Sequence, residues 1–173
     1  MHFRGPTTLL LSLLCLITMT IGSEAAADHS QRSFFARLTG FHEVPAVFSN
    51  GEGTLSLKFR PDRVDFTLTY RNLSLAPAVA HLHLGERHVS GGVFVFLCGG
   101  GGQPACPATT SGVVQGSFTA ANIMAVQGLP AGDLDAAKRA ILAGAAYANM
   151  HTPPNWPGGE IRGQVVPDRR RSN

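Results

Sequence analysis

Alternation of apolar and polar residues at every second position is the feature that most constrains how this chain can fold. Leu55, Leu57 and Phe59 alternate with polar residues, and the segment 64–70 repeats the pattern. A period of two predicts strands buried on one face, because successive side chains of a strand point to opposite faces. Further short apolar segments, separated by Gly, Pro and Asn clusters, lie at 78–84, 92–98, 112–118, 146–152 and 160–166. The sequence therefore predicts an all-β protein made of antiparallel strands.

One strand and one helix depart from this pattern. The segment 92–98 is apolar at nearly every position, which is typical of a central strand covered on both faces. A helix is expected over 134–143, because Asp133 is a suitable N-cap and Gly144 is placed to end it. Together the elements predict a Greek-key β-sandwich of the immunoglobulin-like or superoxide-dismutase-like type, with one short helical excursion near 133–143.

The composition fits one domain of this kind and excludes several other classes. With 173 residues the chain is long enough for one core but not for two full domains. Only 14% of its residues are charged, which fits strands that carry Thr, Ser, Gln and Asn on their outer faces. The formal charge is +3, but acidic and basic residues balance between residues 28 and 168, so a nucleic-acid partner is not expected.

Residues 1–27 have the three parts of an export signal. Arg4 precedes an uncharged apolar stretch, and small residues near its end offer small-x-small cleavage sites. An uncleaved membrane anchor is the alternative, but the apolar stretch is shorter than the roughly 20 residues that a span needs. We expect a secreted or periplasmic protein with no membrane span after cleavage, a mature domain over 28–167 and a disordered basic tail over 168–173.

The cysteines favour a disulfide once the signal is removed. Cys15 leaves with the signal, so the mature chain keeps Cys98 and Cys106. An even pair in an oxidising compartment suggests a disulfide, and the glycines between the two residues let the sulfurs meet. A metal or redox role is less favoured, because the spacing is not Cys-x-x-Cys and no further cysteine is present.

The histidines are the titratable residues in the most unusual arrangement. His81 and His83 are two apart, so on a strand both imidazoles project from the same face. Such a pair can present two neutral nitrogens to copper or zinc, and His151 would complete a three-histidine site if its strand lies beside the first. In the alternative, the pair is the polar half of the alternation, and His151 hydrogen-bonds a turn carbonyl or a carboxylate such as Glu160.

Glu160 and Arg162 form a second pair two residues apart and share a strand face. In a protein with so few charges, we expect them to form a hydrogen-bonded ion pair that fixes strand register or a loop. No second acid is close to Glu160 in the sequence, so general acid–base catalysis is not indicated. Nucleophile-elbow, nucleotide-binding and zinc-protease motifs do not occur in the chain.

Several segments, in order along the chain, together resemble the CHRD domain, a module first noted in the secreted protein chordin and found singly in exported bacterial proteins. They are the Glu-Val-Pro at 43–45, the His-x-His-x-Gly at 81–85, the Tyr-x-Asn-x-His-Thr at 147–152 and the Gly-Glu-Ile-Arg-Gly-Gln at 159–164. The resemblance runs from about residue 33 to residue 166 and implies an extracytoplasmic β-rich domain without an established reaction. The residues on its motif positions include His81, His83, Asn149, His151, Glu160 and Arg162.

These observations lead to two functional hypotheses. The first is a non-enzymatic extracytoplasmic binding or structural module whose partner, ligand and oligomeric state stay open; growth-factor binding is not carried over, because chordin has several such domains and this chain has one. The second is a copper- or zinc-binding protein that uses His81, His83 and His151. Copper–zinc superoxide dismutases also place a His-x-His on a sandwich strand, but their two-metal site needs about six histidines and an aspartate, and the surrounding segments differ.

Overall fold

The computed structural model describes residues 1–2 and 32–168. The expected export signal lies outside the described residues except for its first two positions, and the expected tail lies outside them except for Asp168. The elements are β1 (Ser33–Thr39), η2 (Gly40–His42), β2 (Glu52–Phe59), β3 (Val64–Arg71), β4 (Val79–Leu84), β5 (Gly92–Cys98), β6 (Gly112–Phe118), η3 (Ala120–Asn122), α1 (Leu134–Leu142), β7 (Ala146–Thr152), β8 (Trp156–Gln164) and β9 (Val166–Pro167).

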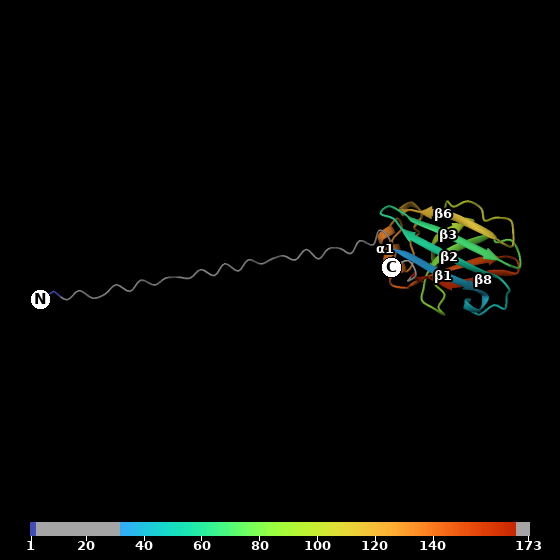
Figure 1. Ribbon diagram of the computed structural model, residues 1–173, viewed down its shortest axis with the longest axis horizontal. Helices are drawn as coiled ribbons and strands as arrows, with labels where there is room; N and C mark the ends of the chain where they lie inside the picture. Colours follow the sequence, from blue (N-terminus) through green and yellow to red (C-terminus); the bar gives the residue numbers. More distant parts are fainter. Residues whose placement is uncertain (3–31, 169–173) are drawn as a thin grey trace.

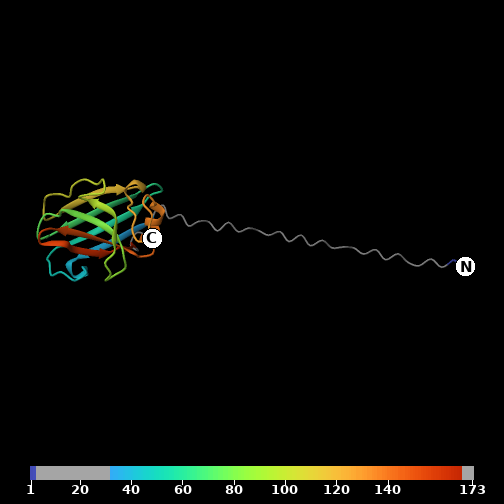
Figure 2. The same cartoon turned by 180° about the vertical axis from the view of Figure 1, so that it is seen from behind.

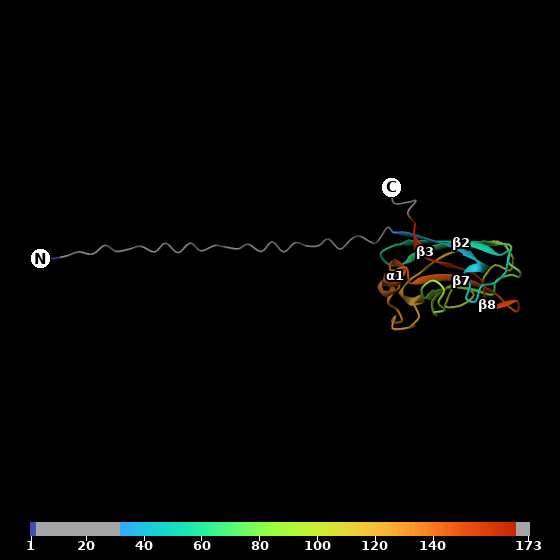
Figure 3. The same cartoon turned by 90° about the horizontal axis from the view of Figure 1, so that it is seen from below.

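The strands form one continuous antiparallel sheet in the order β5-β4-β7-β8-β1-β2-β3-β6, with β9 beside β1. This sheet folds back on itself into two layers: seen from below, β2 and β3 lie in one layer and β7 and β8 in the other (Figure 3). Strands β1, β2, β3 and β6 run side by side across the near layer (Figure 1). The view from behind shows the other layer, where the orange-to-red end of the chain lies beside the yellow-green strands (Figure 2).

The core fills the space between the two layers and follows the alternation in the sequence. Leu55, Leu57 and Phe59 of β2 and Leu68 of β3 are all at most 1% exposed. The polar residues between them point outward, as in a strand buried on one face. The all-β class with a single short α-helix is confirmed for the described residues.

Strand β5 differs from the sequence-based prediction. It was expected in the centre of a sheet, but it ends the strand order and pairs only with β4 in the ladder. Two register shifts in the β4–β5 pairing leave Phe94 and Leu97 without a partner in β4. Such shifts break the period of two, which explains how Phe94, Val95, Leu97 and Cys98 can all be fully buried in an edge strand.

The helix and the disulfide match their predictions. Asp133 caps α1 by accepting a hydrogen bond from Ala136 N at 2.7 Å, and Gly144 follows the helix with a φ of +73°. Helix α1 lies at one end of the sandwich (Figure 3). A disulfide joins Cys98, at the end of β5, to Cys106 in the connection toward β6. In the described part of the chain, none of the helices has the length and apolar character to cross a membrane.

Candidate metal centre

Neighbouring strands place the predicted site residues in one polar row. His81 of β4 pairs with Asn149 of β7, and Asn149 pairs with Arg162 of β8. The residues that alternate with them, such as Leu82 and Ile161, are buried in the core. Since successive side chains of a strand point to opposite faces, the polar row lies on the outer face of this layer.

A loop covers this outer face. The Nη2 atom of Arg162 donates hydrogen bonds to the carbonyl oxygens of Glu86 and Val89, at 3.0 and 2.8 Å, and so holds the loop between β4 and β5 over the row. His81 and His83 are only 7% and 8% exposed although they point away from the core. His83 contacts the loop at Gly91 O, and His81 packs edge to face on Phe96 of β5. The polar row is therefore a partly desolvated site and not an ordinary wet surface.

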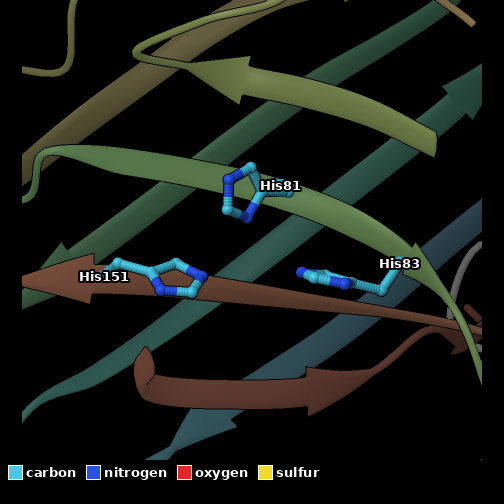
Figure 4. A group of neighbouring side chains, drawn as sticks. All are labelled: His81, His83 and His151. Carbon is cyan, nitrogen blue, oxygen red and sulfur yellow. The ribbon is translucent and has the colours of Figure 1, made fainter. Parts of the chain in front are cut away.

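The three predicted histidines meet in this row. His81, His83 and His151 each contribute a nitrogen, and these atoms all lie within 4.8 Å of one another. Figure 4 shows the rings of the two β4 residues and of the β7 residue facing one common space. The adjacency that the sequence could not establish is thus present, because β4 and β7 are direct neighbours. His42 and His88 are not part of the cluster and are exposed.

The side-chain oxygen of Asn149 lies at the centre of the cluster. Its Oδ1 is 3.4 Å from His81 Nδ1, 3.0 Å from His83 Nε2 and 3.1 Å from His151 Nε2. Asn149 itself is 3% exposed. One amide oxygen is therefore shared among all three imidazoles.

In two of the rings, the nitrogen that faces away from Asn149 is hydrogen-bonded to a backbone carbonyl. His83 Nδ1 lies 2.9 Å from Gly91 O, and His151 Nδ1 lies 2.9 Å from Pro157 O. A carbonyl oxygen can only accept, so the tautomer with the proton on Nδ1 satisfies these backbone carbonyls and leaves each Nε2 with its lone pair. An Nδ1–H bound to a carbonyl is the usual second contact of a metal-binding histidine. The contact of His151 with a turn carbonyl is also the one that the metal-free alternative predicted.

Burial keeps the three rings neutral. Desolvation is the main cause that lowers the pKa of His81 to about 4, and the neighbouring His151 and His83 lower it further. Desolvation likewise lowers the pKa of His83 and of His151, and their backbone hydrogen bonds oppose it. At neutral pH each of the three rings is therefore uncharged and keeps one nitrogen lone pair.

Glu43 is a member of this site that the sequence-based assignment missed. It follows η2, is 8% exposed, and its Oε1 atom has no hydrogen-bond partner among the described residues. Burial raises the pKa of Glu43 to about 7, against the opposing effects of Arg162 and Asn149. A Cβ atom at Gly159 would overlap Glu43 Oε1 and lie 2.9 Å from Asn149 Nδ2, so the glycine makes room for the carboxyl beside Asn149.

Tyr147 is also part of this site, although the sequence-based prediction gave it no role. Its ring stacks on His83 with 4.7 Å between ring centroids and an interplanar angle of 4°. The Arg162 guanidinium lies 3.4 Å from the centroid of the Tyr147 ring. Tyr147 therefore fixes the orientation of both groups. The signal for Glu43 and Tyr147 was their position in the Glu-Val-Pro and Tyr-x-Asn-x-His segments.

The expected ion pair between Glu160 and Arg162 is wrong. In the described part of the chain Glu160 instead accepts hydrogen bonds from Ser49 Oγ at 2.5 Å, Ser74 N at 2.8 Å and Thr152 Oγ1 at 2.5 Å. These donors satisfy the carboxylate, while Arg162 is drawn to the carbonyls of the covering loop. Each residue fixes a loop, but through different partners.

The donor set fits a small divalent transition metal. Imidazole nitrogen suits zinc and copper, and bonds of about 2.0–2.1 Å in a tetrahedron separate ligand atoms by about 3.3 Å. The distances from Asn149 Oδ1 to the three nitrogens are already close to that value. Nitrogens up to 4.8 Å apart would have to close together around an ion.

Comparison with known proteins finds a family model that covers the segments of the site. The family model described as the CHRD domain matches residues 34–165. No curated protein and no solved structure shows significant similarity to the chain. The matched range contains Glu43, the three histidines, Asn149 and Arg162. It also spans most of the chain, and the chain therefore belongs to the CHRD domain family.

Proposed function

We propose that this chain is an exported module that binds one divalent transition-metal ion, zinc or copper, through His81, His83 and His151. The family and the disulfide between Cys98 and Cys106 support export, because disulfides persist in oxidising compartments. The expected signal at residues 1–27 belongs to the same proposal.

The observation that carries the proposal is an electrostatic conflict that a cation removes. His83 and His151 each have a carbonyl oxygen on both ring nitrogens, yet a neutral imidazole has a single N–H to donate. With the proton on Nδ1, the lone pair of each Nε2 faces the lone pairs of Asn149 Oδ1. A bound cation between these atoms turns two repulsive contacts into coordination bonds.

Asn149 is the fourth ligand in this proposal, through Oδ1. Three imidazoles and an amide oxygen then fill a tetrahedral shell, and structural zinc sites have four protein ligands whereas catalytic sites keep an open position. The arrangement favours a binding or structural module over an enzyme.

The competing arrangement contains no metal. Rotation of the Asn149 amide by a half-turn would direct its NH2 group at the histidine nitrogens and its oxygen at Glu43. Glu43 would then have to be protonated to donate to that oxygen. Because the pKa of Glu43 is about 7, this arrangement is weakened at pH 8, where the carboxyl is charged.

Calorimetric titration of the oxidised mature protein with zinc chloride, and separately with copper chloride, tests the proposal at pH 8. We expect one ion per chain for at least one metal, and a loss of affinity of at least about 100-fold in His83→Ala and in His151→Ala. His88→Asn is the matched control, because His88 is exposed and Asn tolerates its φ of +61°.

Circular dichroism of each variant checks that the fold is retained. The proposal is overturned if neither ion binds, or if folded His83→Ala and His151→Ala bind as tightly as the wild type and His88→Asn.

A further inference from the structure

A hollow lined by three segments of the chain shares no lining residue with the histidine cluster. It has a volume of about 600 Å³, in the range of small-molecule sites. Its walls come from the segment before β2, the segment after β3 and the start of β8. The residues that matter for its chemistry are Phe48, Asn50, Asn72, Asn155, Trp156 and Glu160.

A buried carboxylate whose oxygens are all hydrogen-bonded forms the base of this hollow. Glu160 is fully buried, and its two oxygens accept hydrogen bonds from Ser49, Ser74 and Thr152. These contacts tie together the two loops that form the walls. The carboxylate therefore has no free oxygen to attract a cationic ligand, and the walls are held in place before any ligand arrives.

Two aromatic side chains, Phe48 and Trp156, line the hollow. Phe48 is 86% exposed and Phe41 beside it is 65% exposed, with their rings edge to face at 6.0 Å between centroids. Trp156 lines the same hollow and is half-buried. Aromatic surface left exposed in this way, next to a cavity, marks a binding site more often than a structural need.

Amides supply the polar groups. Asn50, Asn72 and Asn155 are all exposed at the hollow, and each amide offers hydrogen-bond donors and an acceptor. Among the described residues that line it, the sole charged side chain is Glu160, whose oxygens are already bonded. The ligand that fits is therefore neutral, rich in hydroxyl groups and apolar on part of its surface.

We propose that this hollow binds a neutral saccharide. The apolar C–H faces of a sugar ring pack on Phe48 and Trp156, and its hydroxyl groups exchange hydrogen bonds with the three asparagine amides. The proposal rests on its own observations and does not depend on metal binding at the histidines.

The test uses the full mature protein produced in bacteria, because Asn72 begins an Asn-Leu-Ser glycosylation sequon. Maltotriose, cellotriose and triacetylchitotriose are titrated separately into isotope-labelled protein, and NMR follows the Trp156 indole and the asparagine side-chain amides. We expect at least one of the three to shift these signals with a dissociation constant of about 1 mM or tighter.

Variants separate saccharide binding from other uses of the same surface. Phe48→Ala and Trp156→Ala should each weaken binding about tenfold, which corresponds to one aromatic contact. Phe48→Ala should fold normally because the side chain is so exposed, and Met124→Ala, which shortens a 42% exposed side chain outside the hollow, is the control.

The proposal is overturned if none of the three saccharides shifts these signals at about 10 mM, or if Phe48→Ala and Met124→Ala bind them equally. It is also overturned if only a charged glycan or a protein occupies the surface.

Discussion

The buried carboxyl of Glu43 gives a prediction whose size follows from the structure. Burial raises the pKa of the Glu43 carboxyl to about 7. The Glu43→Gln variant puts a neutral amide of nearly the same shape in place of this carboxyl. At pH 8 the wild type must keep a buried charge that the variant lacks. At pH 4.5 the wild-type carboxyl is protonated and resembles the glutamine. The stability of the variant relative to the wild type should therefore depend strongly on pH.

The sign and size come from proton binding. The folded state takes up the proton near pH 7, whereas the unfolded chain does so near the ordinary value of 4.5. The contribution of the carboxyl to the free energy of unfolding is thus fully present below pH 4.5 and is lost as the pH rises through 7. The difference corresponds to at most about 3 kcal/mol, and residual solvent contact reduces this to about 2 kcal/mol.

The buried histidines change the free energy of unfolding with pH in the opposite direction to Glu43. Their contribution is the same in wild type and variant, so it cancels in the difference between the two proteins. The pKa of His81 is about 4 in the folded protein and 6.5 ordinarily, so its contribution to stability is present above pH 6.5 and is lost as the pH falls toward 4. This loss occurs in both proteins. The difference between wild type and Glu43→Gln therefore isolates the carboxyl.

Urea unfolding in the presence of a chelator, at several pH values from 8 to 4.5, measures this difference. We expect Glu43→Gln to gain about 2 kcal/mol relative to the wild type on going from pH 4.5 to pH 8. Glu86→Gln, which removes an exposed carboxyl, is the matched control. Parallel stability curves for wild type and Glu43→Gln over the whole range would refute the reasoning.

Three further predictions concern stability. Replacement of both Cys98 and Cys106 by serine should lower the free energy of unfolding by about 2.6 kcal/mol, the loop-closure value for this spacing, as measured by urea unfolding. Gly159→Ala should cost more than about 2 kcal/mol in the same assay, because its Cβ would overlap Glu43 Oε1 and its φ is +124°. Glu160→Gln should cost about 3 kcal/mol, because a neutral amide with one acceptor oxygen replaces a carboxylate whose two oxygens accept from Ser49, Ser74 and Thr152; urea unfolding measures the loss.

Each of these predictions has a result that contradicts it. Equal stability of the double serine variant and the oxidised wild type would contradict the prediction for the disulfide. For Gly159, the control is Gly158→Ala, where no described atom lies within 4 Å of the added Cβ, and equal losses at both glycines contradict the argument. For Glu160, wild-type stability of the glutamine variant would show that the hydrogen-bond network is not needed.

The parts of the fold that depend on local pattern could be predicted from the sequence. The alternation at Leu55, Leu57 and Phe59 predicts a half-buried strand because the period of two is a property of the strand itself. The helix after Asp133 is equally local, since its cap and its glycine stop lie within one short segment. The position of β5 is not local, because it depends on register shifts against β4.

The candidate site was predictable only in part, for the same reason. The shared direction of His81 and His83 follows from their spacing, but the approach of His151 depends on which strands are neighbours. Glu43 lies more than a hundred residues from Asn149 in the sequence and reaches it because β1 and β7 both flank β8 in the sheet. The partners of Glu160 likewise lie on loops that no short-range pattern places.

The most direct test of the account is the location of a metal ion in a crystal of the protein grown with zinc at pH 8. Anomalous difference maps at the zinc edge should show one peak about 2.0–2.2 Å from His81 Nδ1, His83 Nε2 and His151 Nε2, with Asn149 Oδ1 as the fourth ligand. Zinc elsewhere, or an empty cluster in which the Asn149 amide donates to the histidine nitrogens, would contradict the proposed function.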